Sequence, residues 1–167
     1  MRLLIFLILF ISITLFSCDK TEEYSFIPEI KYTKTDIYTG TDQLGNVSDI
    51  LEVQFSFVDG DGDLGLTQAD TNGVFAPGED YYYNLRFQIF EKIDGQFVLN
   101  EAEKQNFRFQ NISKQQTNNK VLKGDMITKL YLSKENNYSD TLKVSFYIYD
   151  RALNKSNIEE STELILK

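Results

Sequence analysis

The chain has 167 residues, a net charge of −8, a single cysteine and no histidine. The absence of histidine excludes Ser-His-Asp and Cys-His nucleophilic sites and imidazole acid–base chemistry, and it leaves oxygen atoms as the main metal ligands. The acidic balance disfavours nucleic acid, whose phosphates repel carboxylates, and favours cations as partners. With one cysteine there is no internal disulfide, so the core, with any bound metal, must hold the fold.

Residues 3–16 form an uncharged apolar run that follows Arg2 and ends just before Cys18. A run of this length is typical of a signal peptide, whereas a membrane-spanning helix needs ~20 apolar residues. A spanning helix or a buried core helix is the alternative interpretation. Cleavage after residue 17 would leave a 150-residue chain with a net charge of −9, because Arg2 is the only charged residue removed. That length suits one domain.

The sequence Leu15-Phe16-Ser17-Cys18 resembles the lipobox of bacterial lipoproteins. In that family the cysteine thiol takes up diacylglycerol, and several acyl chains on one cysteine anchor a protein stably. The resemblance therefore implies an outer-membrane lipoprotein tethered through Cys18. Residues 18–23 are similar to the acidic export signal of some Bacteroidetes lipoproteins, which implies exposure at the cell surface. An anchor that faces the periplasm is the alternative.

After a short polar tether at residues 18–28, apolar and polar residues alternate with the period of a half-buried strand. The alternation is strict at residues 51–57, 83–89 and 142–148. Weaker strand signals lie at residues 29–38, 96–100, 106–112, 127–132 and 158–166. Between two of these runs, Asp94-Gly95 predicts a tight hairpin, because both residues tolerate the positive φ of a type I′ turn.

Seven or eight short strands separated by polar turns predict an all-β fold, an antiparallel immunoglobulin-like β-sandwich over residues 29–167. Residues 146–157 resemble the last hairpin of bacterial immunoglobulin-like domains, in which a strand ends in aspartate and a small-residue turn leads into the final strand. Leu153 stands in that turn where glycine or alanine is commoner.

An acidic, glycine-rich segment, DGDGDLG at residues 59–65, directly follows the strand predicted at residues 51–58. The carboxylates of Asp59, Asp61 and Asp63 repel one another, and glycine between them lets the backbone curl until all three meet at one point. A bound cation would offset that repulsion. The alternative is an exposed turn in which the aspartates cap backbone amides and hold no ion.

The spacing of these acids resembles a calcium loop of the Asp-x-Asp-x-Asp type, and Asp70 stands twelfth, where an EF-hand loop has its closing acid. Leu64 occupies the EF-hand glycine position and the flanks are strands, so the resemblance implies a calcium loop on another scaffold. Magnesium, which tolerates irregular cages poorly, fits less well. The pattern is also similar to that of uncharacterised Bacteroidetes surface lipoproteins.

In an immunoglobulin-like sandwich the loop after the second strand and the loop before the last strand emerge at the same end. We therefore expect Asp150 beside the acidic segment. The predicted calcium ligands are Asp59, Asp61, Asp63, Asp150 and the carbonyl of Gly65, with Asp70 and Asn154 as further candidates.

The leading functional interpretation is a membrane-anchored, non-enzymatic binding or assembly module with a calcium-stabilised loop and an unidentified protein or glycan partner. A sandwich fold by itself implies no function. One alternative is a glycan-binding accessory of a nutrient-uptake system, with Tyr81, Tyr82 and Tyr83 stacking on sugar rings. A less favoured alternative is a small hydrolase that uses Glu79 and Asp80 as an acid and base pair.

Overall fold

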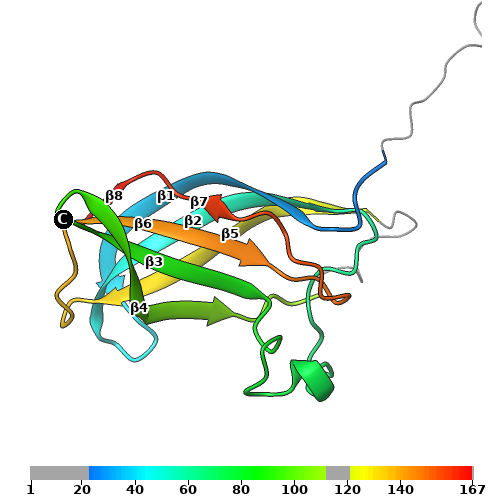
Figure 1. Cartoon of the computed structure of the whole chain (residues 1–167). Helices are drawn as coiled ribbons and strands as arrows, with labels where there is room; N and C mark the ends of the chain where they lie inside the picture. Colours follow the sequence, from blue (N-terminus) through cyan, green and yellow to red (C-terminus); the bar gives the residue numbers. More distant parts are fainter. Residues whose placement is uncertain (1–22, 112–120, 167) are drawn as a thin grey trace, which may run out of the picture.

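The computed structural model describes residues 23–111 and 121–166, which form two antiparallel sheets packed face to face (Figure 1). The predicted signal peptide and Cys18 lie outside these residues. The elements are β1 Glu29–Thr41, β2 Val47–Asp59, a short 3-10 helix η1 Gly73–Phe75, β3 Leu85–Ile93, β4 Gln96–Phe107, β5 Leu122–Ser133, β6 Thr141–Ile148, β7 Glu159–Glu160 and β8 Leu164–Ile165.

One sheet has the strand order β1-β2-β5, and the other has the order β4-β3-β6-β7, with β8 also paired to β6. Every paired strand is antiparallel. The fourth strand extends the sheet of the third strand, a sandwich arrangement related to that of immunoglobulin domains. The predicted all-β immunoglobulin-like sandwich of seven or eight strands is therefore confirmed.

The core lies between the two sheets and centres on three aromatic rings from three strands. Phe55 of β2, Phe87 of β3 and Phe146 of β6 are all at most 1% exposed. The ring centroids of Phe146 lie 4.9 Å from Phe55 and 5.2 Å from Phe87. Residues at odd positions of β2 are buried and those at even positions are half-buried from Leu51 to Asp59, as the alternation predicts.

The strand predicted at residues 96–100 and the start of the one predicted at residues 106–112 form the single strand β4, which ends at Phe107; residue 112 lies outside the described residues. The pairing with β3 is interrupted at residues 100–103 of β4 and resumes in a shifted register, since Lys104 pairs with Gln88 and Leu99 pairs with Phe90. After β4 ends, the backbone no longer pairs with β3. The Phe109 amide instead donates a hydrogen bond of 2.6 Å to Oδ1 of the Asn84 side chain. The prediction of a second strand after residue 106 was wrong for this reason.

The predicted last strand, residues 158–166, is divided into β7 and β8 because its register against β6 shifts by one residue. Ser161 lies at the shift. Its hydroxyl accepts the Val144 amide at 3.0 Å, and its own amide donates to the Val144 carbonyl at 2.8 Å. The predicted hairpin is present between β3 and β4, where Asp94 and Gly95 have φ values of 50° and 81°.

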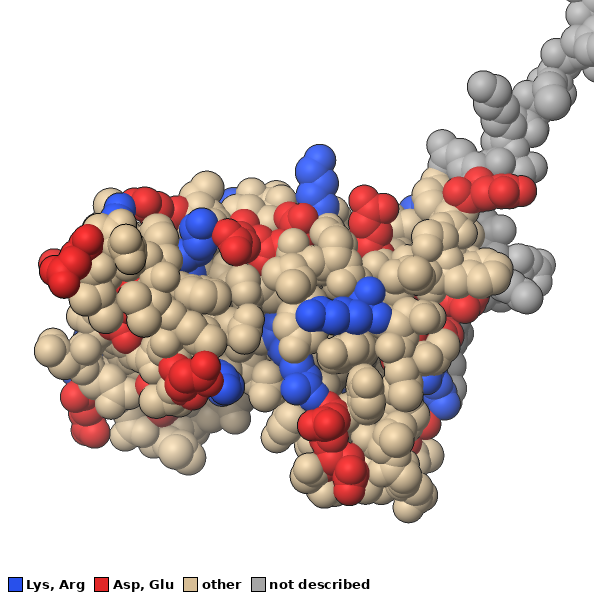
Figure 2. Space-filling model, viewed as in Figure 1, with Lys and Arg blue, Asp and Glu red and all other residues tan. Residues whose placement is uncertain are grey.

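Acidic and basic side chains are interspersed over the face shown in Figure 2. Within residues 23–111 and 121–166, the structure contains no helix with the length and apolarity needed to cross a membrane.

Candidate metal centre

The acidic loop begins where β2 ends, at Asp59, and three glycines shape it. Gly62 and Gly65 have φ values of 71° and 93°, which favour glycine. Gly60 is needed for a different reason: its amide donates to the Ser25 carbonyl at 2.9 Å, and a Cβ on Gly60 would lie 2.4 Å from the carbonyl oxygens of Tyr24 and Ser25. Part of the predicted tether therefore packs directly against the loop.

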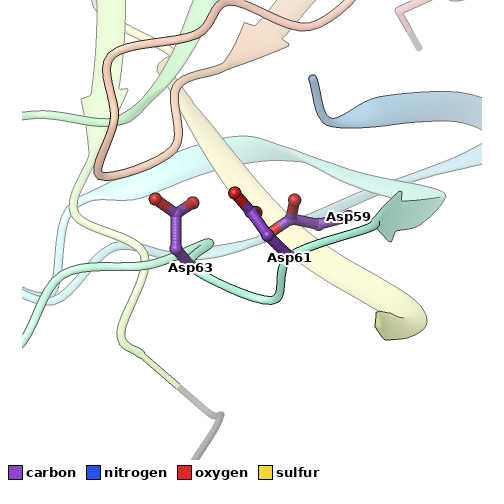
Figure 3. Close-up of side chains that lie close together, drawn as sticks. All are labelled: Asp59, Asp61 and Asp63. Carbon is purple, nitrogen blue, oxygen red and sulfur yellow. The ribbon is translucent and has the colours of Figure 1, made fainter. Parts of the chain in front are cut away.

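The carboxylates of Asp59, Asp61 and Asp63 converge on one side of the loop (Figure 3). One oxygen from each lies within 4.8 Å of the others. Calcium ligands lie 2.3–2.6 Å from the ion, so oxygens that share one calcium are at most about 5 Å apart. The spacing of the three carboxylates therefore fits one shared cation.

Each of the three carboxylates also has a buried oxygen, Oδ1, without a hydrogen-bond partner among the described residues. Asp59 is 0% exposed, so the unpartnered oxygen on this residue lies inside the protein. Buried polar atoms almost always have a partner, and those that do not require an explanation. A cation at the centre of the loop would satisfy all three oxygens at once.

The other oxygens of the cluster hold the loop in shape. Asp59 Oδ2 accepts the Leu64 amide at 2.8 Å, which closes the loop across five residues. Asp63 Oδ2 accepts the Ala152 amide at 3.1 Å and so joins the loop to the turn after β6. One oxygen of each of these two carboxylates is thus structural, while the other faces the cluster.

Burial and the close approach of other carboxylates raise the pKa values of Asp59 and Asp63 in this loop. Burial, opposed by the Leu64 hydrogen bond and assisted by the Asp61 and Asp63 charges, raises the pKa of Asp59 to about 7. Burial also raises the pKa of Asp63, and the nearby charges of Asp150 and Asp61 raise it further. Carboxyl groups with raised pKa values in a cluster bind a proton or a cation more readily than isolated ones.

Asp150 lies beside the loop, as the strand order of the fold predicts. Its backbone forms an isolated bridge with Leu64, and it is 1% exposed. Burial raises its pKa, hydrogen bonds from Asn154 lower it, and the charge of Asp61 raises it. Both Asp150 oxygens accept hydrogen bonds from Asn154, at 2.7 and 2.8 Å, so Asn154 orients this carboxylate. Leu153, at the expected small-residue position, has a φ of 69°.

Two predicted ligands, Asp70 and Gly65, have hydrogen-bond partners outside the cluster. Asp70 Oδ2 accepts both the amide and the hydroxyl of Thr67, and Asp70 Oδ1 pairs with Arg151 at 3.0 Å. Gly65 is buried, and its carbonyl oxygen lies 3.5 Å from Asn111 Nδ2. The oxygens of Asp70 and Gly65 thus have other partners.

The three consecutive tyrosines are packed edge to face. The ring centroids of Tyr82 and Tyr83 lie 4.8 Å apart, and those of Tyr81 and Tyr149 lie 5.0 Å apart. Tyr149 in turn contacts Tyr147 at 5.5 Å, so a row of rings continues onto β6. Tyr83 is the most open of the three consecutive residues, at 41% exposed.

Sequence reasoning missed the two backbone contacts that hold the acidic loop, those of Ser25 and Ala152. The signal for the first was Gly60, a glycine placed between two aspartates. No signal pointed to Ala152, because its contact depends on how the β6–β7 turn folds over Asp63. Comparison with known proteins found no matching family model, curated protein or solved structure.

Proposed function

We propose that the acidic loop binds one calcium ion, held by Asp59, Asp61 and Asp63 with Asp150 beside them. The observation that carries this proposal is the set of three unpartnered carboxylate oxygens, one of them on the fully buried Asp59. Burying an unpaired charge is costly unless a group of opposite charge accompanies it. The described residues give these oxygens no such partner.

Calcium suits the site better than other cations. The chain has no histidine to attract zinc, and all the converging atoms are carboxylate oxygens, which prefer hard cations. A loop held by two glycines with positive φ is irregular, and calcium accepts irregular geometry where magnesium requires a near-ideal octahedron. The ion would link the β2–β3 loop to the β6–β7 turn.

Thermal unfolding tests this proposal. Extracellular calcium modules bind at about 10⁻⁴ to 10⁻³ M, so millimolar calcium at the tighter end stabilises the fold by roughly 1.4 kcal/mol. That corresponds to a rise in Tm of about 3–6 °C. Asp61→Asn and Asp150→Asn each remove a charge near the ion and should abolish the rise, while Asp36→Asn, on exposed β1, should keep it.

The outcomes separate the parts of the proposal. If the wild-type Tm does not respond to calcium, the loop is a turn without an ion. If Asp150→Asn responds like the wild type, Asp150 is not part of the site. Isothermal titration with calcium and with magnesium then decides which cation the loop prefers.

We further propose that the domain is anchored to the outer membrane through a lipid on Cys18. The support is the apolar run, the lipobox-like residues and the lone cysteine. The chain reaches the domain next to Gly60, so the calcium loop would lie at the end nearest the anchor. Labelled fatty acid should enter the wild type and be lost in Cys18→Ala, and protease treatment of whole cells tests surface exposure. Equal labelling of both proteins would rule out the anchor.

The role that fits this architecture best is a non-enzymatic binding or assembly module. Because the chain has no histidine, it offers no imidazole for acid–base catalysis. A glycan-binding accessory is the second candidate, supported by the row of partly exposed tyrosine rings that runs from Tyr81 through Tyr149 to Tyr147. Binding on a glycan array that weakens in Tyr81→Ala would favour it.

A further inference from the structure

Strand β5 is an edge of the β1-β2-β5 sheet, and near its end a side chain of β4 satisfies the outward backbone groups of Tyr131. There the side chain of Gln105 pairs with Tyr131: the Tyr131 amide donates to Gln105 Oε1 at 3.1 Å, and Gln105 Nε2 donates to the Tyr131 carbonyl at 2.8 Å. Backbone groups in an antiparallel strand alternate in direction. Asp125, Ile127 and Lys129 therefore turn their amides and carbonyls outward, as Tyr131 does.

The opposite edge of the same sheet is protected at its start, where β1 begins. The amides of Ile30 and Tyr32 in β1 donate to side chains of Asn157 and Glu159, each at 2.8 Å, and Asn157 returns a hydrogen bond to the Ile30 carbonyl. By contrast, within the described chain no hydrogen bond reaches the outward backbone groups of residues 125, 127 and 129. An unpaired edge of this kind is a template for another strand.

The side chains along this edge are self-complementary. Ile127 is 58% exposed, and it stands midway between the exposed acid Asp125 and the base Lys129. The Lys129 ammonium lies 3.5 Å from Glu52 Oε2 on β2, but 46% of the Lys129 side chain is exposed, so it can also face an acid on the open side of β5. We propose that a second copy of this chain pairs antiparallel with β5, about a two-fold axis at Ile127. Asp125 would then face Lys129 of the partner subunit, and Ile127 would face Ile127 of the partner subunit. Opposite charges directly across a strand pair stabilise it, whereas like charges destabilise it.

The surroundings of β5 fit this register. Pairing would end before Tyr131, whose backbone is already bonded to Gln105, so the ladder is limited to the three free positions. A groove of about 440 Å³ lies beside the strand, and its apolar lining includes Leu85, Phe107, Phe109 and Met126. Side chains at positions 126 and 128 of the incoming strand would face this groove, since neighbours along a strand point to opposite faces. A two-fold axis makes both contacts identical.

Cysteine cross-linking tests the register in the full chain carrying Cys18→Ser. Residues directly opposite in a hydrogen-bonded pair have Cα atoms about 5.5 Å apart, which allows a disulfide. Ile127→Cys should therefore form a disulfide-linked dimer on mild oxidation. Asp125→Cys is the matched control, because position 125 faces position 129, and it should form little dimer. Equal cross-linking of the two variants, or no cross-linking of Ile127→Cys, would overturn the proposal.

Charge reversal tests the same pairing in solution by sedimentation. Asp125→Lys places like charges at both symmetry-related contacts and should weaken dimerisation by about 5–30-fold. Adding Lys129→Asp to that variant should restore the dimer. Lys34→Asp, on the other edge of the sheet, should leave the dimer unchanged. A wild type that stays monomeric at high concentration, or a dimer that Asp125→Lys does not weaken, contradicts strand pairing at β5.

Discussion

The protonation of Asp59 makes stability depend on pH in a direction opposite to ordinary acid denaturation. The pKa of Asp59 is raised from 3.8 to about 7, so the folded protein holds a proton that the unfolded chain has already lost. Stability from this group is fully present below the unfolded value and is lost as pH rises through the folded one. In chelator, the fold should therefore become less stable from pH 5 to pH 8.

The size of the effect follows from the shift. One pKa unit corresponds to about 1.4 kcal/mol. Between pH 5 and pH 7, an interval of about two units, Asp59 in the folded protein keeps its proton while the unfolded chain has lost it. The loss is therefore about 3 kcal/mol, or roughly 6–12 °C in Tm for a domain of this size. The raised pKa values of Asp63 and Asp150 act in the same direction.

Differential scanning calorimetry in chelator, at pH 5 and at pH 8, measures this change. Asp59→Asn keeps an oxygen for the Leu64 amide but cannot titrate, so its Tm should vary much less with pH. Saturating calcium should also flatten the wild-type profile, because the ion replaces the proton. A wild-type Tm that is equal at both pH values in chelator, or an Asp59→Asn variant with the full pH dependence, would contradict a raised pKa at Asp59.

Three further substitutions test the packing. Phe146→Ala removes a ring at the centre of the core and should lower the free energy of unfolding by about 3–5 kcal/mol in urea denaturation; a loss below 1 kcal/mol would contradict this placement. Gly65→Ala forces a side chain onto a φ of 93° with its Cβ 2.7 Å from the Asn111 Cα, so it should destabilise more than Gly45→Ala, whose φ is 88° in open space; equal losses would contradict the close contact. Gly60→Ala should displace the segment at Ser25 and speed chymotrypsin cleavage there relative to wild type, and unchanged cleavage would show that the segment is not held.

The fold was predictable because its strands are regular. Alternation identified β2, β3 and β6, which meet in the core through Phe55, Phe87 and Phe146. The errors fell where side chains replace the backbone ladder. Asn84 ends the pairing of β4, and Ser161 shifts the register of the last strand, and neither role can be inferred without knowing which backbone group each side chain meets.

For the site, the sequence predicted the acids that converge but not all of their neighbours. Asp150 was placed correctly next to the loop because immunoglobulin-like topology brings the two turns together. Asp70 was grouped with the cluster on EF-hand spacing, but the chain after Leu66 is held to Phe109 and Asn111, and Asp70 pairs with Thr67 and Arg151. The EF-hand spacing applies to a loop between two helices, so it does not predict which acids meet in a loop that follows a strand.

The burial of Asp59 follows from the strand that precedes it. In β2 every odd residue from Leu51 to Phe57 points into the core, and Asp59 occupies the next odd position, so the pleat carries its carboxylate inward. An exposed turn would leave the acids solvated, but this position cannot be solvated without breaking the alternation. The carboxylate must then either hold a proton, as its raised pKa allows, or share a cation with Asp61 and Asp63. If the loop binds calcium as proposed, these two states compete near neutral pH, and the pH dependence of Tm with and without calcium measures their balance.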